Sequence, residues 1–188
     1  RILGVSRVPL REALRVLAAE GLLSHRPHQG YFVTKMSTEN LEQIHTLLEF
    51  LETELLRTAR WPADEEVAGL RRINAEYARA AEAGDALAMS ARNKDLHERI
   101  FDLSPLEVIR AEQRRFWTLS EPYRLMHIAT TDPQVTIDQH EQIIDALAAR
   151  DRALTLRASA EHRHGAQMAA RNLLLSGPRP VQRPLAAS

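Results

Sequence analysis

The chain has 188 residues, with 25 lysines and arginines against 25 acidic residues and no cysteine. This length allows a small domain beside one medium domain, and the lack of cysteine excludes a disulfide framework. No apolar run approaches the roughly 18 residues that span a bilayer, and no signal peptide is evident, so we expect a cytoplasmic protein without a membrane partner. Residues 1–36 hold six basic and two acidic side chains, and this basic head suits a polyanion partner.

The first segment reads as the latter part of a helix-turn-helix. Residues 4–6 form a turn with Ser6 as helix N-cap, and the helix runs to about Glu20, where Gly21 ends it. One face of this helix is apolar and is expected to dock on the domain's own core; it carries Leu10, Ala13, Leu14 and Leu17. Basic side chains recur every four residues on a neighbouring face, at Arg7, Arg11 and Arg15.

Two short strands are expected next, over 22–26 and 31–34, with hairpin residues at 27–30 between them. A solvated amphipathic helix is the alternative for the arginines alone. The complete run of turn, arginine-bearing helix, glycine stop and hairpin instead favours a winged helix-turn-helix that binds nucleic acid.

From residue 37 onward the sequence predicts six helices and no strand, so the fold class is mostly α. The first helix starts at Ser37 or Thr38 and reaches about residue 60, and the second follows Pro62 to about residue 83. Asp85 caps the third, and Ser104 with Pro105 starts the fourth. The last two begin near 132 and 151 and end near 150 and 175. Residues 176–188 are polar and proline-rich and are expected to be a disordered tail.

Four polar side chains on three predicted helices are candidates for a metal site. Asn93 and His97 stand four residues apart and so share a helix face, while His140 and His162 lie inside two later helices. Neutral imidazoles suit Zn, Ni, Cu or Fe, and bundle interiors commonly hold such sites. Spacing alone leaves open that each histidine is a bystander. His164 points about 200° away from His162 and cannot replace it.

The stretch GVSRVPLREALRVLAAEGLL, followed by RPHQGYFV, closely resembles the winged helix-turn-helix of GntR-type bacterial transcription regulators. The resemblance covers the chain up to Val33 and implies contacts with operator DNA from the recognition helix and the wing tip. The residues concerned are Ser6, Arg7, Val8, Arg11, Gln29 and Gly30. That family's domain begins with a further helix and the front of a second, so we expect this sequence to lack the start of the domain.

The body resembles the helical effector domain called FCD, which is found in the FadR branch of these regulators. The segments NKDLHERIF, DQHEQIIDALAARD and ASAEHRHGA are similar to its three ligand motifs, and six helices fit the VanR-like subgroup. The resemblance implies a divalent metal, with Zn favoured over Ni or Mn, on Asn93, His97, His140 and His162. The family commonly has aspartate where this chain has Asn93, so the metal is expected to bind more weakly or to rely on a carboxylate from the effector.

Members with this site hold a small carboxylate ligand beside the metal. The candidate effector-binding residues are Arg92, Arg115, Tyr123 and Arg124, with Glu49 and Glu52 as further polar groups near the first body helix. Trp117 and Phe116 are interpreted as core. The remaining histidines are interpreted as surface or wing residues, namely His25, His28, His45 and His127.

These features predict a ligand-responsive transcription regulator that binds a palindromic operator in double-stranded DNA as a homodimer. A metal-dependent hydrolytic enzyme is the first alternative, but no general base, nucleophile motif or His-Glu-x-x-His helix accompanies the histidines. A helical dimerisation module that has lost its metal at Asn93 is the second.

Overall fold

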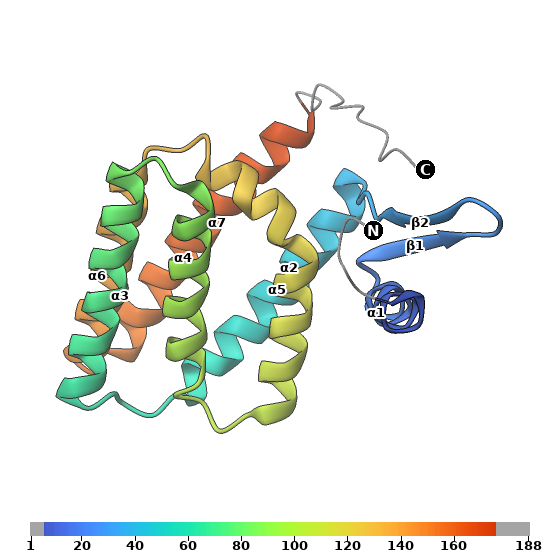
Figure 1. Ribbon diagram of the computed structural model, residues 1–188. Coiled ribbons are helices and arrows are strands. Elements are labelled where there is room, and N and C mark those ends of the chain that lie inside the picture. The colour runs from blue at the N-terminus through green and yellow to red at the C-terminus, as the bar shows by residue number, and fades with distance from the viewer. Residues whose placement is uncertain (1–5, 176–188) are drawn as a thin grey trace.

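The computed structural model describes residues 6–175 and consists of a small head and a helical body (Figure 1). The head contains helix α1 (Arg7–Ala19) and an antiparallel hairpin of β1 (Leu23–Arg26) and β2 (Gly30–Val33), in which Leu23 pairs with Val33 and Arg26 with Gly30. The predictions for residues 1–5 and for the tail at 176–188 lie outside the described residues.

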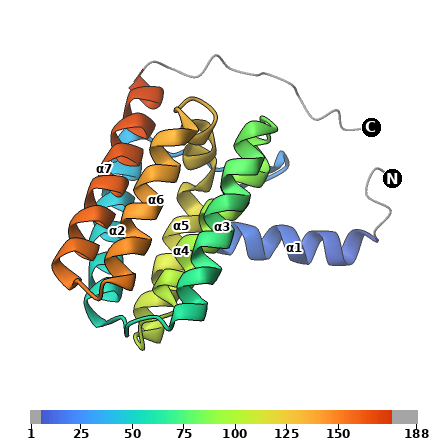
Figure 2. The same ribbon diagram turned by 90° about the vertical axis from the view of Figure 1, so that its left-hand side faces the viewer.

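The body is the predicted bundle of six helices, which confirms the fold class. These are α2 (Thr38–Thr58), α3 (Asp64–Glu82), α4 (Ala86–Phe101), α5 (Glu107–Ile128), α6 (Pro133–Ala148) and α7 (Arg152–Leu175). Helix α3 packs against α4 and α6, while α2 packs against α5 and α7. The head stands to one side of the bundle, next to α2 and α5 (Figures 1 and 2). No helix between residues 6 and 175 is long and apolar enough to cross a bilayer.

The main core lies where all six body helices meet. Its buried side chains are Leu55, Leu56, Val67, Leu70, Ile73, Leu96, Ile100, Phe101, Trp117, Ile143, Ile144, Leu147 and Ala158. Helix α2 presents an apolar stripe to the bundle, because Leu41, Leu48 and Leu55 are at most 3% exposed. Burial of these aliphatic side chains supplies the main driving force for packing the bundle.

Side-chain caps fix several helix starts where the sequence predicts them. Ser37 Oγ accepts a hydrogen bond from Asn40 N at 3.2 Å, Asp85 Oδ1 from Ala88 N at 2.9 Å, and Asp151 Oδ1 from Leu154 N at 2.9 Å. Ser6 occupies the N-cap position of α1 in an extended conformation, but its side chain makes no cap hydrogen bond. Asp132 Oδ1 likewise accepts from Gln134 N at 3.0 Å at the start of α6. Four of the body helices therefore begin through the local chemistry that their capping residues provide.

The predicted start of α5 is wrong. The helix begins at Glu107 rather than beside Pro105, and Ser104 lies before it. Ser104 is 1% exposed, and its hydroxyl bonds both Leu106 N at 3.2 Å and the hydroxyl of Thr58 at 2.8 Å. A tertiary contact with α2 thus uses the serine that the sequence pattern assigned to a helix cap.

The apolar face of α1 is less covered than predicted. Strand β1 packs against the helix, yet Leu10 and Leu17 each remain 37% exposed and Val16 is 56% exposed. No core of the kind expected for this face forms within residues 6–175. The basic face carries Arg11, which is exposed, and Arg15, which pairs with Glu12 at 3.1 Å on the surface.

Candidate functional site

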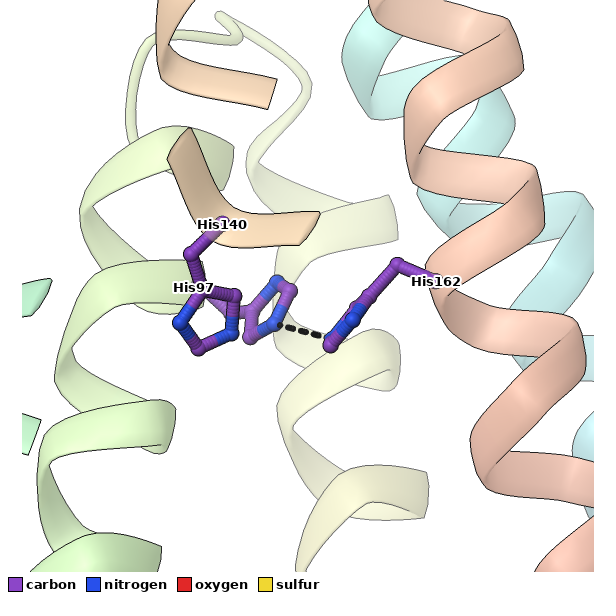
Figure 3. A group of neighbouring side chains, drawn as sticks. All are labelled: His97, His140 and His162. Atoms are coloured by element: carbon purple, nitrogen blue, oxygen red, sulfur yellow. Dashed lines mark hydrogen bonds between the residues drawn. The ribbon is translucent and has the colours of Figure 1, made fainter. Parts of the chain in front are cut away.

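The bundle brings three histidines from three helices to one point in its interior (Figure 3). His97 comes from α4, His140 from α6 and His162 from α7, and one ring nitrogen from each lies within 4.8 Å of the other two. The Nε2 atoms of His97 and His162 are 3.1 Å apart. Of the sequence-predicted histidine candidates, the structure therefore brings together these three.

Helical periodicity explains why the α4 donors point inward. The buried positions of α4 include Met89, Asn93, Leu96, His97 and Ile100, which recur in steps of three and four. Asn93 and His97 therefore share the face that the apolar residues bury. His140 is fully buried in the same way between the core residues of α6.

Hydrogen bonds from Asn74 on α3 fix the orientation of the His140 ring. Asn74 Nδ2 donates to Ile137 O at 3.1 Å and to Glu141 Oε1 at 2.8 Å, so its Oδ1 faces His140 Nδ1 at 3.0 Å. Because Oδ1 only accepts, Nδ1 carries the proton and Nε2 carries the lone pair. This lone pair points toward the other two rings.

A second amide orients His162 in the same way. Gln139 Oε1 lies 2.9 Å from His162 Nδ1, which therefore donates, and the lone pair of His162 is left on Nε2. That atom faces Nε2 of His97 at 3.1 Å. Two imidazole lone pairs thus converge on the space beside His97, and this concentration of acceptors favours a positively charged occupant.

Asn93 adds an oxygen to this group of acceptors. Its Oδ1 lies 3.1 Å from His140 Nε2, the atom left without a proton. Two acceptors at this distance repel each other. The pair is stabilised when the amide turns over to present its N–H, or when a cation binds both atoms.

Burial keeps all three imidazoles neutral near pH 7. It lowers the pKa of His140 to about 4, and it lowers the pKa values of His97 and His162 well below the usual 6.5. For His97 and His162 the neighbouring imidazoles and the guanidinium groups of Arg124 and Arg163 add to the effect of burial on the pKa. Neutral imidazole is the form that binds a metal.

The donor set fits a divalent metal. Two nitrogens bound to one tetrahedral zinc lie roughly 3.4 Å apart, close to the 3.1 Å between the Nε2 atoms of His97 and His162. The other ring nitrogens of His140 and His162 are held by amide oxygens, an arrangement typical of metal-binding histidines. Within residues 6–175 these three histidines are the only such group close enough to share an ion.

A cavity adjoins the histidines on the side of α2, α5 and α7. The space in it that the centre of a water molecule can reach is about 50 Å³. Its polar lining consists of His45, Glu52, His97, Ser120, Arg124, Ser159, His162, Arg163 and Gln167. Trp117 forms part of its wall and is only 5% exposed, so this residue belongs to the core, as predicted, and also to the cavity. The cavity is small and mixes cationic with apolar groups.

Arg124 forms no ion pair within 4.0 Å with a carboxylate of the described residues, although Glu52 and Glu121 are close enough to favour its charge. Its guanidinium lies 3.7 Å from the centre of the Trp117 ring and donates to Ser120 Oγ at 3.0 Å. Its Nε is buried and has no hydrogen-bond partner among the described residues. Burial lowers the pKa of Arg124 to about 10, so the group stays charged near pH 7. A partly satisfied guanidinium in a cavity is a binding group for a carboxylate.

The second cation in the lining, Arg163, is already paired. It donates to Glu52 Oε2 at 2.9 Å, and Gln113 Nε2 donates to the other oxygen of Glu52 at 3.3 Å. Both members of the ion pair are nearly buried, with side chains 12% and 9% exposed. Glu52, which the sequence analysis names as a further polar group for the effector site, lies in the cavity wall.

Three of the four predicted effector residues lie away from the cavity. Arg92 pairs with Glu76 at 3.0 Å and Arg115 with Glu112 at 3.1 Å, both as partly exposed surface pairs. The hydroxyl of Tyr123 bonds the backbone of the linker between head and body instead. Only Arg124 of this set lines the cavity.

Sequence reasoning missed several residues around the histidines. His45 was assigned to the surface, but it lines the cavity, and burial lowers its pKa to about 4. His127 is also partly buried and bonds Thr131 Oγ1 at 2.8 Å. Asn74 and Gln139 carry no motif that would identify them, because their role depends on which helices meet.

The predicted DNA-contact residues lie at the start of α1 and at the tip of the β1–β2 hairpin. Ser6, Val8 and Arg11 are exposed at the start of α1, and the side chain of Arg7 is outside the description. Gln29 is exposed at the hairpin tip, where Gly30 has a φ of +96° and an added Cβ would meet no atom within 4 Å. Nothing within residues 6–175 blocks access to these groups from outside.

Comparison with known proteins places both parts of the chain. The FCD domain matches residues 43–165, and the bacterial regulatory proteins of the gntR family match residues 1–33. The Nta operon transcriptional regulator of Aminobacter aminovorans is 33% identical over 152 residues, covering 79% of this chain and 70% of the relative. A probable D-xylose utilization operon transcriptional repressor of Paenarthrobacter nicotinovorans is 30% identical over 171 residues, covering 85% and 71%.

Solved structures agree on the fold. E. coli McbR/YncC superimposes with a TM-score of 0.83 at 22% identity, covering 90% of this chain and 82% of that one. A putative GntR transcriptional regulator from Rhodococcus sp. RHA1 gives 0.75 at 18% identity, covering 95% and 84%. The matched families and relatives are transcription regulators. These matches exclude the alternative of a metal-dependent hydrolytic enzyme. The chain belongs to the GntR family of bacterial transcription regulators and carries an FCD domain.

Proposed function

We propose that this regulator senses a small carboxylate through a divalent metal held by Asn93, His97, His140 and His162. The observation that carries the proposal is the convergence of imidazole lone pairs in a buried cluster beside a cavity that contains an unpaired guanidinium. Three nitrogen donors favour zinc, with nickel next, over the oxygen-preferring manganese. When bound, the metal supplies a Lewis-acidic site for the effector's oxygen.

Arg124 is the proposed partner for the effector's carboxylate. It lies against the same indole ring as His97, at 3.7 Å from the ring centre against 5.2 Å for the imidazole centre. A ligand that reaches the histidines is therefore also close to the guanidinium. The cavity is lined by side chains from five body helices, so we propose a compact effector that fits between them.

The proposed route to the head runs along α5. Tyr123 lies between the cavity-lining residues Ser120 and Arg124. Its hydroxyl accepts from Met36 N at 2.8 Å and donates to Met36 O at 3.3 Å. Met36 belongs to the linker between β2 and α2. A shift of Arg124 toward an effector would therefore move a residue that is bonded directly to the linker.

DNA recognition is assigned to the head. Arg7 and Arg11 are proposed to read base edges in the major groove, with Ser6 and Val8 beside them, and Gln29 and Gly30 to enter the minor groove. Two heads in a homodimer would match a palindromic operator. Effector binding would change DNA affinity through a coupling of about 1–3 kcal/mol, equivalent to roughly 5- to 150-fold.

The metal proposal is tested by elemental analysis of the purified protein and of the His97→Ala and His140→Ala variants. We expect about one equivalent of metal in the parent protein and loss of it in both variants, while His164→Ala, an exposed histidine on α7, keeps it. If the three variants held as much metal as the parent protein, His97 and His140 would be excluded as metal ligands. Absence of metal from all of them, after growth with added zinc, would favour the metal-free dimerisation module.

The DNA assignment is tested with a protein that includes a complete head. Arg11→Ala is expected to lose preference at defined operator positions by about 1–3 kcal/mol, as measured in a gel-shift series over single-base operator variants. Arg115→Ala, an exposed arginine on α5, serves as the matched control. Unaltered preference at every operator base in Arg11→Ala would rule out the recognition-helix assignment.

A further inference from the structure

Among the described residues, no carboxylate is hydrogen-bonded to the ring nitrogens of the three histidines. The groups that touch the imidazole nitrogens are the amide oxygens of Asn93, Asn74 and Gln139, at 2.9–3.1 Å. The cluster that can share an ion consists of histidines alone among the described residues. A divalent ion bound there would therefore keep its full double charge.

The surroundings of the cluster are cationic. Arg124 and Arg163 line the same cavity as His97 and His162. Their positive charge opposes the binding of a metal ion close by. Arg163 forms an ion pair with Glu52, whereas Arg124 forms no ion pair within 4.0 Å among the described residues.

The one carboxylate in the cavity lining is not free to compensate a metal. Both oxygens of Glu52 are engaged, one with Arg163 at 2.9 Å and the other with Gln113 at 3.3 Å. Moving Glu52 toward the histidines would leave a nearly buried guanidinium without its counter-charge, which is strongly unfavourable. The lining supplies no further negative charge to a metal.

We infer that the metal and a carboxylate effector bind this site as a cooperative pair, with the anion supplying the charge that the protein's neutral Asn93 does not. The inference rests on the proposed metal function and deepens it. The metal is then retained when the effector is present and is released readily when it is absent. By linkage the effector binds tightly only to the metal-loaded protein.

Asn93→Asp tests the inference directly, because it places the missing negative charge 3.1 Å from His140 Nε2 with little change in volume. Zinc affinity is measured by competition with a chromogenic chelator at buffered free zinc, with and without malonate as the probe anion. The buffering removes the effect of zinc chelation by malonate in solution. Malonamide, which is neutral and of similar shape, replaces malonate in a parallel series.

For the parent chain we expect malonate to tighten zinc binding at least 10-fold and malonamide to leave it unchanged. Asn93→Asp should bind zinc at least 10-fold more tightly without any anion, and its response to malonate should shrink to a few-fold or less. Asn40→Asp, which adds the same charge at an exposed position on α2, should behave like the parent.

Arg124→Gln gives a second test that does not depend on Asn93. Removing this cation should raise zinc affinity in the absence of anion and reduce the response to malonate. Parent zinc affinity that is equally tight with and without malonate, and unchanged in Asn93→Asp, would overturn the inference and leave the metal site standing. Failure of the parent and Asn93→Asp to bind zinc under any condition would overturn the proposed function itself.

Discussion

Replacing Asn74 tests whether the bundle positions its histidines through hydrogen bonds from outside the donor set. Asn74→Leu keeps the volume but removes the acceptor for His140 Nδ1–H at 3.0 Å and the donor to Glu141 at 2.8 Å. The His140 ring is fully buried, so its N–H would be left without a partner. Such a loss costs about 1–3 kcal/mol of stability. Glu141 is partly exposed and can turn to water instead.

The effect on the metal follows from the tautomer. Without Asn74, His140 is free to carry its proton on Nε2, the atom that faces Asn93 and the other rings. We therefore expect zinc affinity to fall about 10- to 100-fold, the usual cost of removing an outer hydrogen-bond partner of a metal-binding histidine. Zinc competition measures the affinity, and ¹⁵N NMR of the ring reports which nitrogen is protonated.

Two variants separate positioning from general damage. Asn74→Asp retains an acceptor for Nδ1–H and should keep His140 in the Nε2-lone-pair tautomer, although its charge faces Glu141. Asn40→Leu changes an exposed asparagine and should alter neither readout. If Asn74→Leu folds, keeps the parent tautomer and binds zinc within about twofold of the parent, the outer amide has no positioning role and the reasoning is refuted.

Three further outcomes are expected. In chelator-treated protein, the unfolded chain takes up a proton near pH 6.5 that His140, with a pKa of about 4, does not. His140 should therefore account for about 2 kcal/mol of the fall in the free energy of unfolding from pH 7.5 to pH 5, in addition to the share of other buried histidines such as His45, whose pKa is also about 4. A fall in urea unfolding that is no smaller in His140→Gln would contradict this. Tyr123→Phe, which loses both bonds to Met36, should weaken the effect of effector on DNA binding without changing zinc affinity; an unchanged effector response in gel shifts would exclude this route. Arg152→Met should lower the free energy of unfolding by about 1–3 kcal/mol, because Arg152 donates to two carbonyls at the end of α2 and stacks on Trp61; an unchanged urea midpoint would argue against that.

Helical periodicity predicts much of this fold because the body helices bury residues in steps of three and four and several of them start at a capping side chain. It also predicts that Asn93 and His97 share a face. It does not predict Asn74 or Gln139, because each amide acquires its role only when two helices are brought together, α3 with α6 for Asn74 and α6 with α7 for Gln139. The start of α5 is missed for the same reason, since Ser104 bonds Thr58 across the bundle.

The periodicity of α5 distinguishes the two candidate effector-binding arginines on this helix, Arg115 and Arg124. Its buried residues Gln113, Trp117, Ser120 and Ile128 define one inward face in steps of three, four and eight. Arg124 falls midway between the last two and shares that face, whereas Arg115 does not. Their charge does not distinguish Arg115 from Arg124. Their positions around the helix do, because Arg124 faces the cavity and Arg115 faces the surface.

Helix α5 also explains how a small cavity can reach the head. Consecutive residues on a helix differ by about 100° in direction, so Arg124 lines the cavity while Tyr123 contacts the linker. Pro122 lies just before them and has no N–H for Thr118 O, which loosens the helix at this point. In the proposed mechanism the C-terminal part of α5 moves with Arg124, and this movement also changes the contact of Arg124 with Trp117. The proposed sensor and the linker are joined by two adjacent residues, because Tyr123 bonds Met36 and Arg124 lines the cavity.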